Sequence, residues 1–227
     1  MPDMIHVTLE YSNAVLVALL PIFSDFAKKL DLPVPVPITG DSVQRFVPGR
    51  LPGDVGGSLL LTNGWRFVYS RGHVDAFEAP KNYFTEQHPD RVQEYLGELN
   101  MSRREALALA RETLKRMGYA ERLPQTSKRP SKMEGPVKWR GQTIPWYRIE
   151  WEWRTGDAEH AVWFNIDGQR RQVVRFFAAS TNLWSKPPEI NVKPELESEY
   201  RKRVMGGKQM HRRDPPPERL PPRSVSH

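Results

Sequence analysis

Two stretches of this chain alternate large apolar side chains with polar or charged ones, and this pattern limits the possible folds more than any other. The apolar positions of residues 65–70 are Trp65, Phe67 and Tyr69, and residues 147–154 repeat the pattern with a fully charged second face. Successive side chains of a β-strand point to opposite faces of its sheet, so a period of two indicates strands with one buried face. We therefore expect both stretches to be strands of antiparallel sheets.

Turn-forming dipeptides divide the sequence around these stretches into short strands. Leu59–Thr62, Trp65–Ser70 and His73–Ala79 are separated by Asn63-Gly64 and Arg71-Gly72, which predicts a three-stranded meander. The Asn-Gly pair predicts a two-residue type I′ turn, in which both residues take positive φ angles. We expect a second meander from three later segments, residues 147–154, 161–166 and 172–177.

A first helix is indicated near the start of the chain by apolar residues spaced three and four apart. It is expected to run from Ala14 to about Lys29, with Ser12 or Asn13 as its N-cap. Pro21 lies inside this pattern and removes one backbone donor. We therefore expect the helix to be kinked or divided there.

A second helix has clearer boundaries. Ser102 and Glu105 have the spacing of a capping box, and Gly118 is placed to end the helix. Residues 120–143 contain three prolines and show no period, so they are interpreted as a surface loop. The order of elements is then a helix followed by three strands, twice.

This order predicts an α+β fold of two helix-plus-antiparallel-meander modules, residues 1–98 and 99–185. Residues 186–227 are rich in proline and basic residues, and we expect this tail to be largely disordered. Glu195–Met205 is the segment of the tail that can form a transient helix.

Composition excludes several classes of function. The 227 residues include no cysteine, which excludes disulfides, thiolate metal sites and cysteine nucleophiles. The net charge of +7 comes from residues 111–140 and 186–227 and not from a rigid basic stripe, so specific nucleic-acid binding is not expected. The apolar run Ala14–Phe23 is too short to span a bilayer, and the residues before it lack the basic character of a signal peptide.

Residues 99–178 resemble a PepSY domain. The resemblance rests on the capped helix with Ala106 and Ala110, the loop, the strand with paired aromatics, and the turn Asn165-Ile166-Asp167-Gly168. The chain departs from the commoner Asp-x-x-Thr-Gly motif by carrying Arg170-Arg171 where Thr-Gly would stand. The resemblance implies a cystatin-like, non-catalytic and extracytoplasmic module linked to peptidase regulation, with no catalytic residues to transfer. The residues themselves are equally compatible with a cytoplasmic location.

Candidate residues for chemistry are few. His73 and Asp75 lie two apart on one strand and offer two metal ligands, to which His160 or Glu78 would have to be added for a metal-assisted hydrolase. The alternative interpretation is a surface histidine bonded to its neighbour. Glu150 and Glu152 are interpreted as a charge ladder rather than a catalytic pair. We expect no enzyme and no cofactor.

An interaction site is the more favoured interpretation. Trp139 and Trp146 lie beside Arg140 and Arg148, and tryptophan with arginine is the combination that enriches interface hot spots. The sequence therefore predicts a protein- or peptide-binding module that uses a sheet surface or adds a strand at a sheet edge. An exposed edge makes a homo-oligomer possible. A third alternative is a tail that tethers the protein electrostatically to a polyanion.

Overall fold

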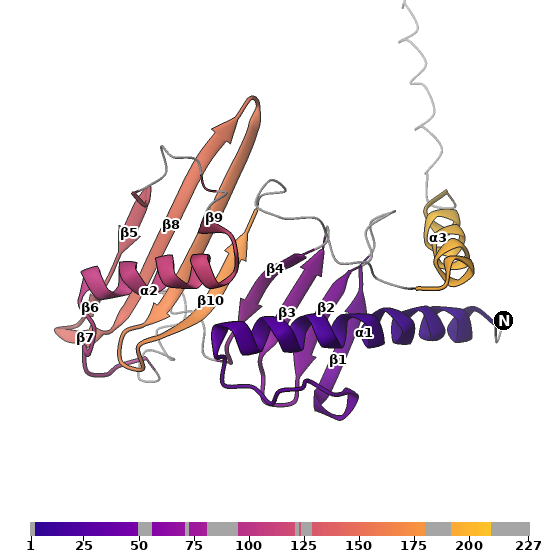
Figure 1. The fold of residues 1–227 in the computed structure, drawn as a ribbon, viewed down its shortest axis with the longest axis horizontal. Helices are drawn as coiled ribbons and strands as arrows, with labels where there is room; N and C mark the ends of the chain where they lie inside the picture. The colour runs from indigo at the N-terminus through magenta and orange to yellow at the C-terminus, as the bar shows by residue number, and fades with distance from the viewer. Residues whose placement is uncertain are drawn as a thin grey trace, which may run out of the picture.

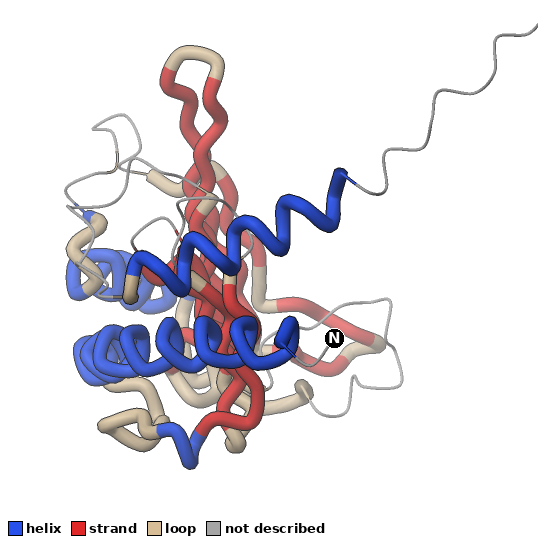
Figure 2. Tube along the Cα trace, turned by 90° about the vertical axis from the view of Figure 1, so that its right-hand side faces the viewer, coloured by secondary structure: helices blue, strands red, loops and turns tan. Residues whose placement is uncertain are grey.

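A computed structural model describes residues 3–49, 56–70, 73–80, 95–120, 123, 129–179 and 192–209. Within these residues, helices α1 and α2 lie on one face of a large antiparallel sheet, as Figures 1 and 2 show. The fold is thus α+β, as predicted. The specific cystatin-like arrangement of two modules stays a prediction.

The elements follow one another as α1 (Asp3–Leu30), η1 (Gly40–Ser42), β1 (Val43–Pro48), β2 (Gly57–Leu61), β3 (Arg66–Ser70), β4 (His73–Glu78), α2 (Arg103–Arg116), β5 (Lys132–Glu134), β6 (Val137–Trp139), β7 (Gln142–Ile144), β8 (Trp146–Thr155), β9 (Ala158–Asp167), β10 (Gln172–Ala178) and α3 (Pro194–Gln209). Eight strands form one sheet in the order β1-β2-β3-β4-β10-β9-β8-β5, and β6 pairs with β7 as a separate hairpin.

Helix α1 starts at Asp3, well before the predicted start at Ala14, so Ser12 and Asn13 lie inside it and cap nothing. Apolar residues recur every fourth position along its buried face, which sets the side that packs on the sheet. The buried residues of this stripe are Tyr11, Val15, Leu19 and Phe23.

Pro21 does not divide α1, which Figure 1 shows as one continuous helix. Proline cannot donate to the carbonyl of Val17, four residues earlier. Val17 exposes 67% of its surface and Pro21 is exposed too, so water can bond that carbonyl instead. The helix continues because its broken hydrogen bond faces solvent.

The first meander has four strands rather than the predicted three. The additional strand, β1, pairs antiparallel with β2 at the edge of the sheet. The turn between β2 and β3 also differs from the expected type I′ turn, in which two residues have a positive φ. Among the residues that join these strands, only Gly64 has a positive φ, at 84°. Leu61 N donates to Trp65 O and Gly64 N to Leu61 O. This is a three-residue loop that closes on glycine, the next commonest way to join a hairpin.

The predicted capping box of α2 is confirmed. Ser102 Oγ accepts a hydrogen bond from Glu105 N, and Glu105 Oε2 accepts one from Ser102 N at 2.8 Å. Gly118 follows the helix with a φ of 76°. Ala106, Ala110 and Leu114 are buried against the sheet.

The interpretation of residues 120–143 as a loop is wrong in part. The described residues of this range contain β5 and β6 and the start of β7, each three residues long. Strands this short give no detectable period, and prolines adjoin them: Pro130 precedes β5, and Pro136 lies between β5 and β6. Residues 124–128 lie outside the described residues.

The predicted second meander is confirmed as β8, β9 and β10, and it joins the first through β10 and β4. The junction pairs Arg175 with Glu78, Phe176 with Phe77, and Phe177 with Ala76. The rings of Phe77 and Phe176 stack with their centroids 5.8 Å apart. The sheet therefore runs without a break across the predicted division at residue 98.

Part of the tail is ordered as helix α3. It includes the segment predicted as a transient helix, and Tyr200 stacks on Tyr11 of α1 with ring centroids 4.2 Å apart. The Tyr200 hydroxyl also donates to the carbonyl of Gly49 at 3.3 Å. The expectation of disorder does not hold for this helix, and for residues 210–227 it falls outside the described residues.

One segment of α1, Leu9–Leu30, reaches the length and the mean hydropathy, 1.2, of a membrane span. By length and composition alone, this helix passes a test that the shorter run Ala14–Phe23 does not reach. The same helix buries a stripe against the sheet, and core helices pass this test too, so it is one weak candidate and not a clear membrane-spanning segment.

Candidate interaction surface

The face of the sheet opposite α1 and α2 is called here the helix-free face. Its side chains lie in rows, because residues paired across neighbouring strands point to the same side. One row crosses all eight strands and is here named the charged row: Glu134, Arg148, Asn165, Arg175, Glu78, Arg66, Leu60 and Arg45.

The adjacent row on the same face has an apolar middle and is here named the apolar row. It consists of Lys132, Glu150, Trp163, Phe177, Ala76, Val68, Ser58 and Val47. The two rows together place aromatic and aliphatic side chains beside arginines at the centre of the uncovered face.

Trp163 is the centre of this surface. The guanidinium carbon of Arg175 lies 4.6 Å from the centroid of its ring, and that of Arg148 lies 5.3 Å from it. The ring of Phe177 contacts it from the next strand, with centroids 5.3 Å apart. Cations over an indole face are attracted by its quadrupole, so the two arginines hold the half-buried ring in place.

The same two arginines, Arg148 and Arg175, also form ion pairs with glutamates of the helix-free face. Arg175 Nε lies 2.7 Å from a carboxylate oxygen of Glu78, and Arg148 Nη2 lies 3.0 Å from one of Glu150. Arg66 reaches Glu78 at 3.8 Å. The Glu150 carboxylate is buried, so its pairing with Arg148 offsets the cost of removing it from water.

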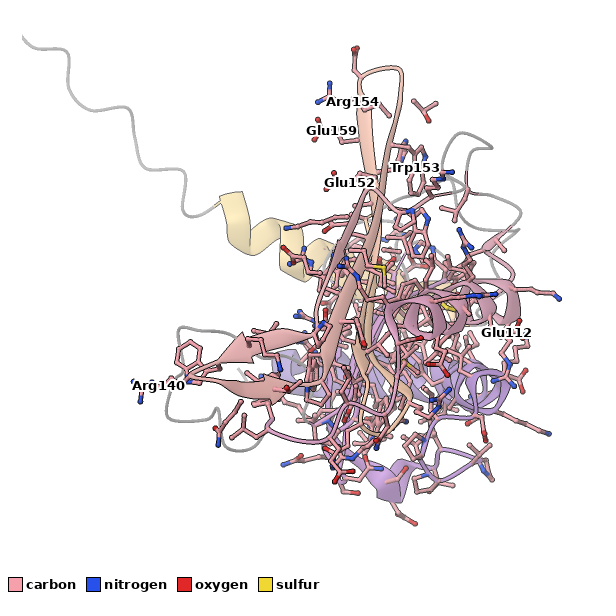
Figure 3. The ribbon with its side chains drawn as sticks, turned by 90° about the vertical axis from the view of Figure 1, so that its left-hand side faces the viewer. Glu112, Arg140, Glu152, Trp153, Arg154 and Glu159 are labelled. Atoms are coloured by element: carbon pink, nitrogen blue, oxygen red, sulfur yellow. The ribbon has the colours of Figure 1, made fainter. Side chains whose placement is uncertain are left out.

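The charged row and the apolar row together hold five basic side chains and three acidic ones; these are Arg45, Arg66, Arg148, Arg175 and Lys132, and Glu78, Glu134 and Glu150. Arg45 is exposed and forms no ion pair with the described residues. The β6–β7 hairpin projects on this side of the sheet and holds Arg140 at its tip, as Figure 3 shows. Arg140 is exposed, and its φ of 46° sits in the turn of that hairpin. The uncovered face is thus bordered by two cations, Arg45 and Arg140, for which the described residues supply no ion pair.

Of the four residues predicted as one interaction site, Trp146 and Arg148 lie two residues apart on the same face of β8. Trp146 is buried, with its ring edge-on to Tyr95 at 5.3 Å, so a partner cannot reach it. Trp139 is half-buried in β6, and Arg140 lies at the hairpin tip. Arg148 belongs to the charged row instead. Trp146 and Arg148 thus share the helix-free face, but Tyr95 covers the ring of Trp146 there, whereas Arg148 stays half-buried.

The predicted metal ligands are not brought together. His73 Nε2 bonds the Asp75 carboxylate, and Ser70 Oγ donates to the same carboxylate, as the alternative interpretation of a histidine bonded to its neighbour predicts. His73 is buried, however, and not the surface residue that this interpretation assumed. His160 lies on β9 and stacks on Trp153, with ring centroids 5.2 Å apart. Among the described residues, no three histidine, aspartate or glutamate side chains could hold a metal ion.

The expected solvated charge ladder across the sheet is not formed at Glu150, which is buried and lies opposite Trp163. Glu150 pairs with Arg148, whereas Glu152 is exposed. An open depression of about 430 Å³ lies beside Glu152 at the outer end of β8 and β9, lined by Glu152, Trp153, Arg154, Glu159, His160, Ala161 and Ala179.

Sequence reasoning missed Trp163, Arg175 and Phe177 as site residues. A signal for them is present in the pairs Trp163-Phe164 and Phe176-Phe177. Adjacent residues of a strand point to opposite faces, so one ring of each pair must lie off the helix-covered core. Phe164 and Phe176 are the fully buried members of the two pairs.

Comparison with family models, with curated proteins and with solved structures finds no match to this chain. The PepSY resemblance of residues 99–178 therefore stays a prediction from the residues quoted for it.

Proposed function

We propose that this protein is a non-enzymatic protein-binding module, and that its helix-free face receives an acidic polypeptide surface. The observation that carries the proposal is the cluster of Trp163 between Arg148 and Arg175 at the middle of a sheet face that no described helix covers.

The composition of this surface supports binding of a protein. Tryptophan and arginine are the residues most enriched in interface hot spots, which lie near the centre of an interface and exclude water. Trp163 meets this description because its ring is rigid, central and half-exposed. Arg148 and Arg175 already hold the ring of Trp163 in place. Binding a partner therefore costs little conformational entropy at this side chain.

The border of the surface supports an acidic partner. Arg45 at one end and Arg140 on the projecting hairpin are exposed cations without an acidic partner in the described residues. Complementary charge at the rim steers a partner toward the surface and sets its orientation. Regulation of a peptidase, which the PepSY resemblance implies, is one form that such binding could take.

The test is a pull-down from a lysate of the source organism with four proteins: wild type, Trp163→Ala, Arg45→Glu and Arg104→Glu. The last is a matched control, because Arg104 is an exposed arginine on α2, away from the helix-free face. Truncation of a hot-spot tryptophan costs about 2 kcal/mol of binding free energy, roughly a 30-fold loss of affinity. We expect Trp163→Ala and Arg45→Glu to lose a protein that the wild type and Arg104→Glu retain, and added salt to weaken its binding.

A partner that all four proteins retain equally would place the contact elsewhere on the molecule. A partner lost only from Arg104→Glu would assign it to the helix side of the sheet.

A further inference from the structure

Within the part of the chain that the structure describes, the outer half of β8 is an open sheet edge. β8 has ten residues, but β5 pairs only with Arg148, Ile149 and Glu150. β5 cannot continue along β8, because the residue that would face Glu152 is Pro130, which has no N–H to donate. No described strand pairs with the segment Trp151–Thr155, and in Figure 1 the β8–β9 hairpin extends beyond its neighbours.

The direction of the backbone groups on this edge follows from two contacts. Ser131, next to β5, donates through Oγ to the carbonyl of Glu150 at 2.9 Å, so the backbone of Glu150 points away from β9. On the far side of β9, Ala179 N donates to Ala161 O, so the odd-numbered residues of β9 point to β10 and the even-numbered ones to β8. The N–H and C=O groups of Glu152 and Arg154 therefore point outward from the open edge.

We propose that two copies of this chain pair through this edge, antiparallel, about a two-fold axis that passes beside Trp153. In this register Glu152 of one copy lies opposite Arg154 of the other, twice, and both residues have outward backbone groups. Each such pair can exchange two backbone hydrogen bonds. Both side chains lie on the helix-free side of the hairpin, as Figure 3 shows, so opposite charges meet twice across the interface.

Charge selects this register over its neighbours. A shift of two residues along the edge places either Glu152 opposite Glu152 or Arg154 opposite Arg154, and like charges directly opposite are destabilising. A shift of one residue sets an outward backbone group against an inward one, so the hydrogen bonds are lost. Only the register centred on Trp153 satisfies both conditions.

The apolar contact at the axis agrees with this register. Trp153 points to the helix side of the sheet and is half-buried, with its ring stacked on His160. Two copies of Trp153 face each other at the axis, where aromatic cross-strand pairs are favourable. Arg154 already pairs with Glu159 on its own chain, so it would bridge that carboxylate and the Glu152 of the second copy.

The pairing is expected to be weak because the edge is short, and interfaces of less than about 1,200 Å² are typical of transient association. The experiment is sedimentation equilibrium of the full chain from about 10 μM to about 1 mM, a range that brackets weak dimers. Wild type is compared with Glu152→Arg, with Arg154→Glu, with the double swap, and with an equimolar mixture of the two single variants.

Each single variant should associate about tenfold more weakly than wild type, because it sets like charges opposite each other twice. The double swap restores opposite charges and should associate as wild type does. The mixture should form heterodimers, since all its cross-strand pairs are then opposite in charge. Far-ultraviolet circular dichroism of each single variant shows whether it is folded.

A second test removes the backbone donor alone. Arg154→Pro deletes an outward N–H without touching the pairing of β8 with β9, and Arg154→Ala removes the side chain but keeps the N–H. Proline should weaken dimerisation beyond the effect of alanine. A wild type that stays monomeric at 1 mM, or single variants that associate as wild type does, would overturn the proposal.

Discussion

At the scale of single residues, Glu105 connects the start of α2 to the turn between β9 and β10. Its carboxylate accepts from Ser102 N, and its other oxygen lies 2.8 Å from Arg171 Nη2. The backbone hydrogen bond from Ser102, followed by the bond from Arg171, lowers the pKa of Glu105 from 4.5 to about 2. The ionised form is therefore favoured by folding.

The first prediction concerns the pH dependence that follows. Because the pKa of Glu105 is lower in the folded protein, its stabilising effect is present above pH 4.5 and is lost as the pH falls toward about 2. Urea unfolding of wild type and Glu105→Gln at several pH values measures this. Wild type should be the more stable above pH 4.5, and the difference should shrink toward pH 2; a constant difference would contradict it.

The second prediction concerns Tyr147, whose hydroxyl donates to the carbonyl of Met101 just before α2. Burial raises the pKa of Tyr147, so the hydroxyl stays protonated and able to donate. Tyr147→Phe leaves that carbonyl without its partner and should lower the free energy of unfolding by about 1 kcal/mol. The midpoint of urea unfolding at constant slope is the measurement, and an unchanged midpoint would show that water replaces the hydroxyl.

At the scale of elements, α3 packs on the body through Leu196 and Tyr200, and the specific ring and hydrogen-bond contacts come from Tyr200. The stack of Tyr200 on Tyr11 and the bond from Tyr200 to Gly49 both depend on one side chain. The third prediction is that Tyr200→Ala releases α3, with a loss of about 1 kcal/mol that is local to this helix. Amide hydrogen exchange should rise in residues 194–209 and stay unchanged in α2, which is the internal control. A rise in both helices would mean that α3 supports the whole fold.

The elements also show which parts of the fold can be predicted from sequence. The strands of residues 147–154 and the capped helix at Ser102 carry their signals within a few residues, and both are confirmed. β1 pairs with the next strand in the chain, β2, but its burial does not alternate with a period of two, and β5 has only three residues. The residues of these two strands therefore carry little of the pattern that predicts a strand. The surface around Trp163 could be identified only once the helices were known to cover the opposite face.

At the scale of the whole molecule, the two halves share one core as well as one sheet. Phe77 of the first half contacts Phe26 and Trp65 on its own side and Phe176 across the junction. The fourth prediction is that Phe77→Ala lowers the free energy of unfolding by about 3–5 kcal/mol and that the protein still unfolds in one transition. Tryptophan fluorescence, dominated by the second half, and far-ultraviolet circular dichroism should give coincident curves. Separate transitions would show that the halves fold independently.

The pairing of β4 with β10 also has a consequence for synthesis of the chain. β4 ends at Glu78, and its partner β10 begins only at Gln172. At about 5–20 residues per second, a ribosome needs roughly 5–20 s to make the roughly 100 residues between them. For that time the nascent first half has a finished strand without its neighbour, and Phe77 lacks its stacking partner Phe176. Exposed edges of this kind pair with other chains, so in cells this protein should depend on chaperones that bind nascent chains at the ribosome.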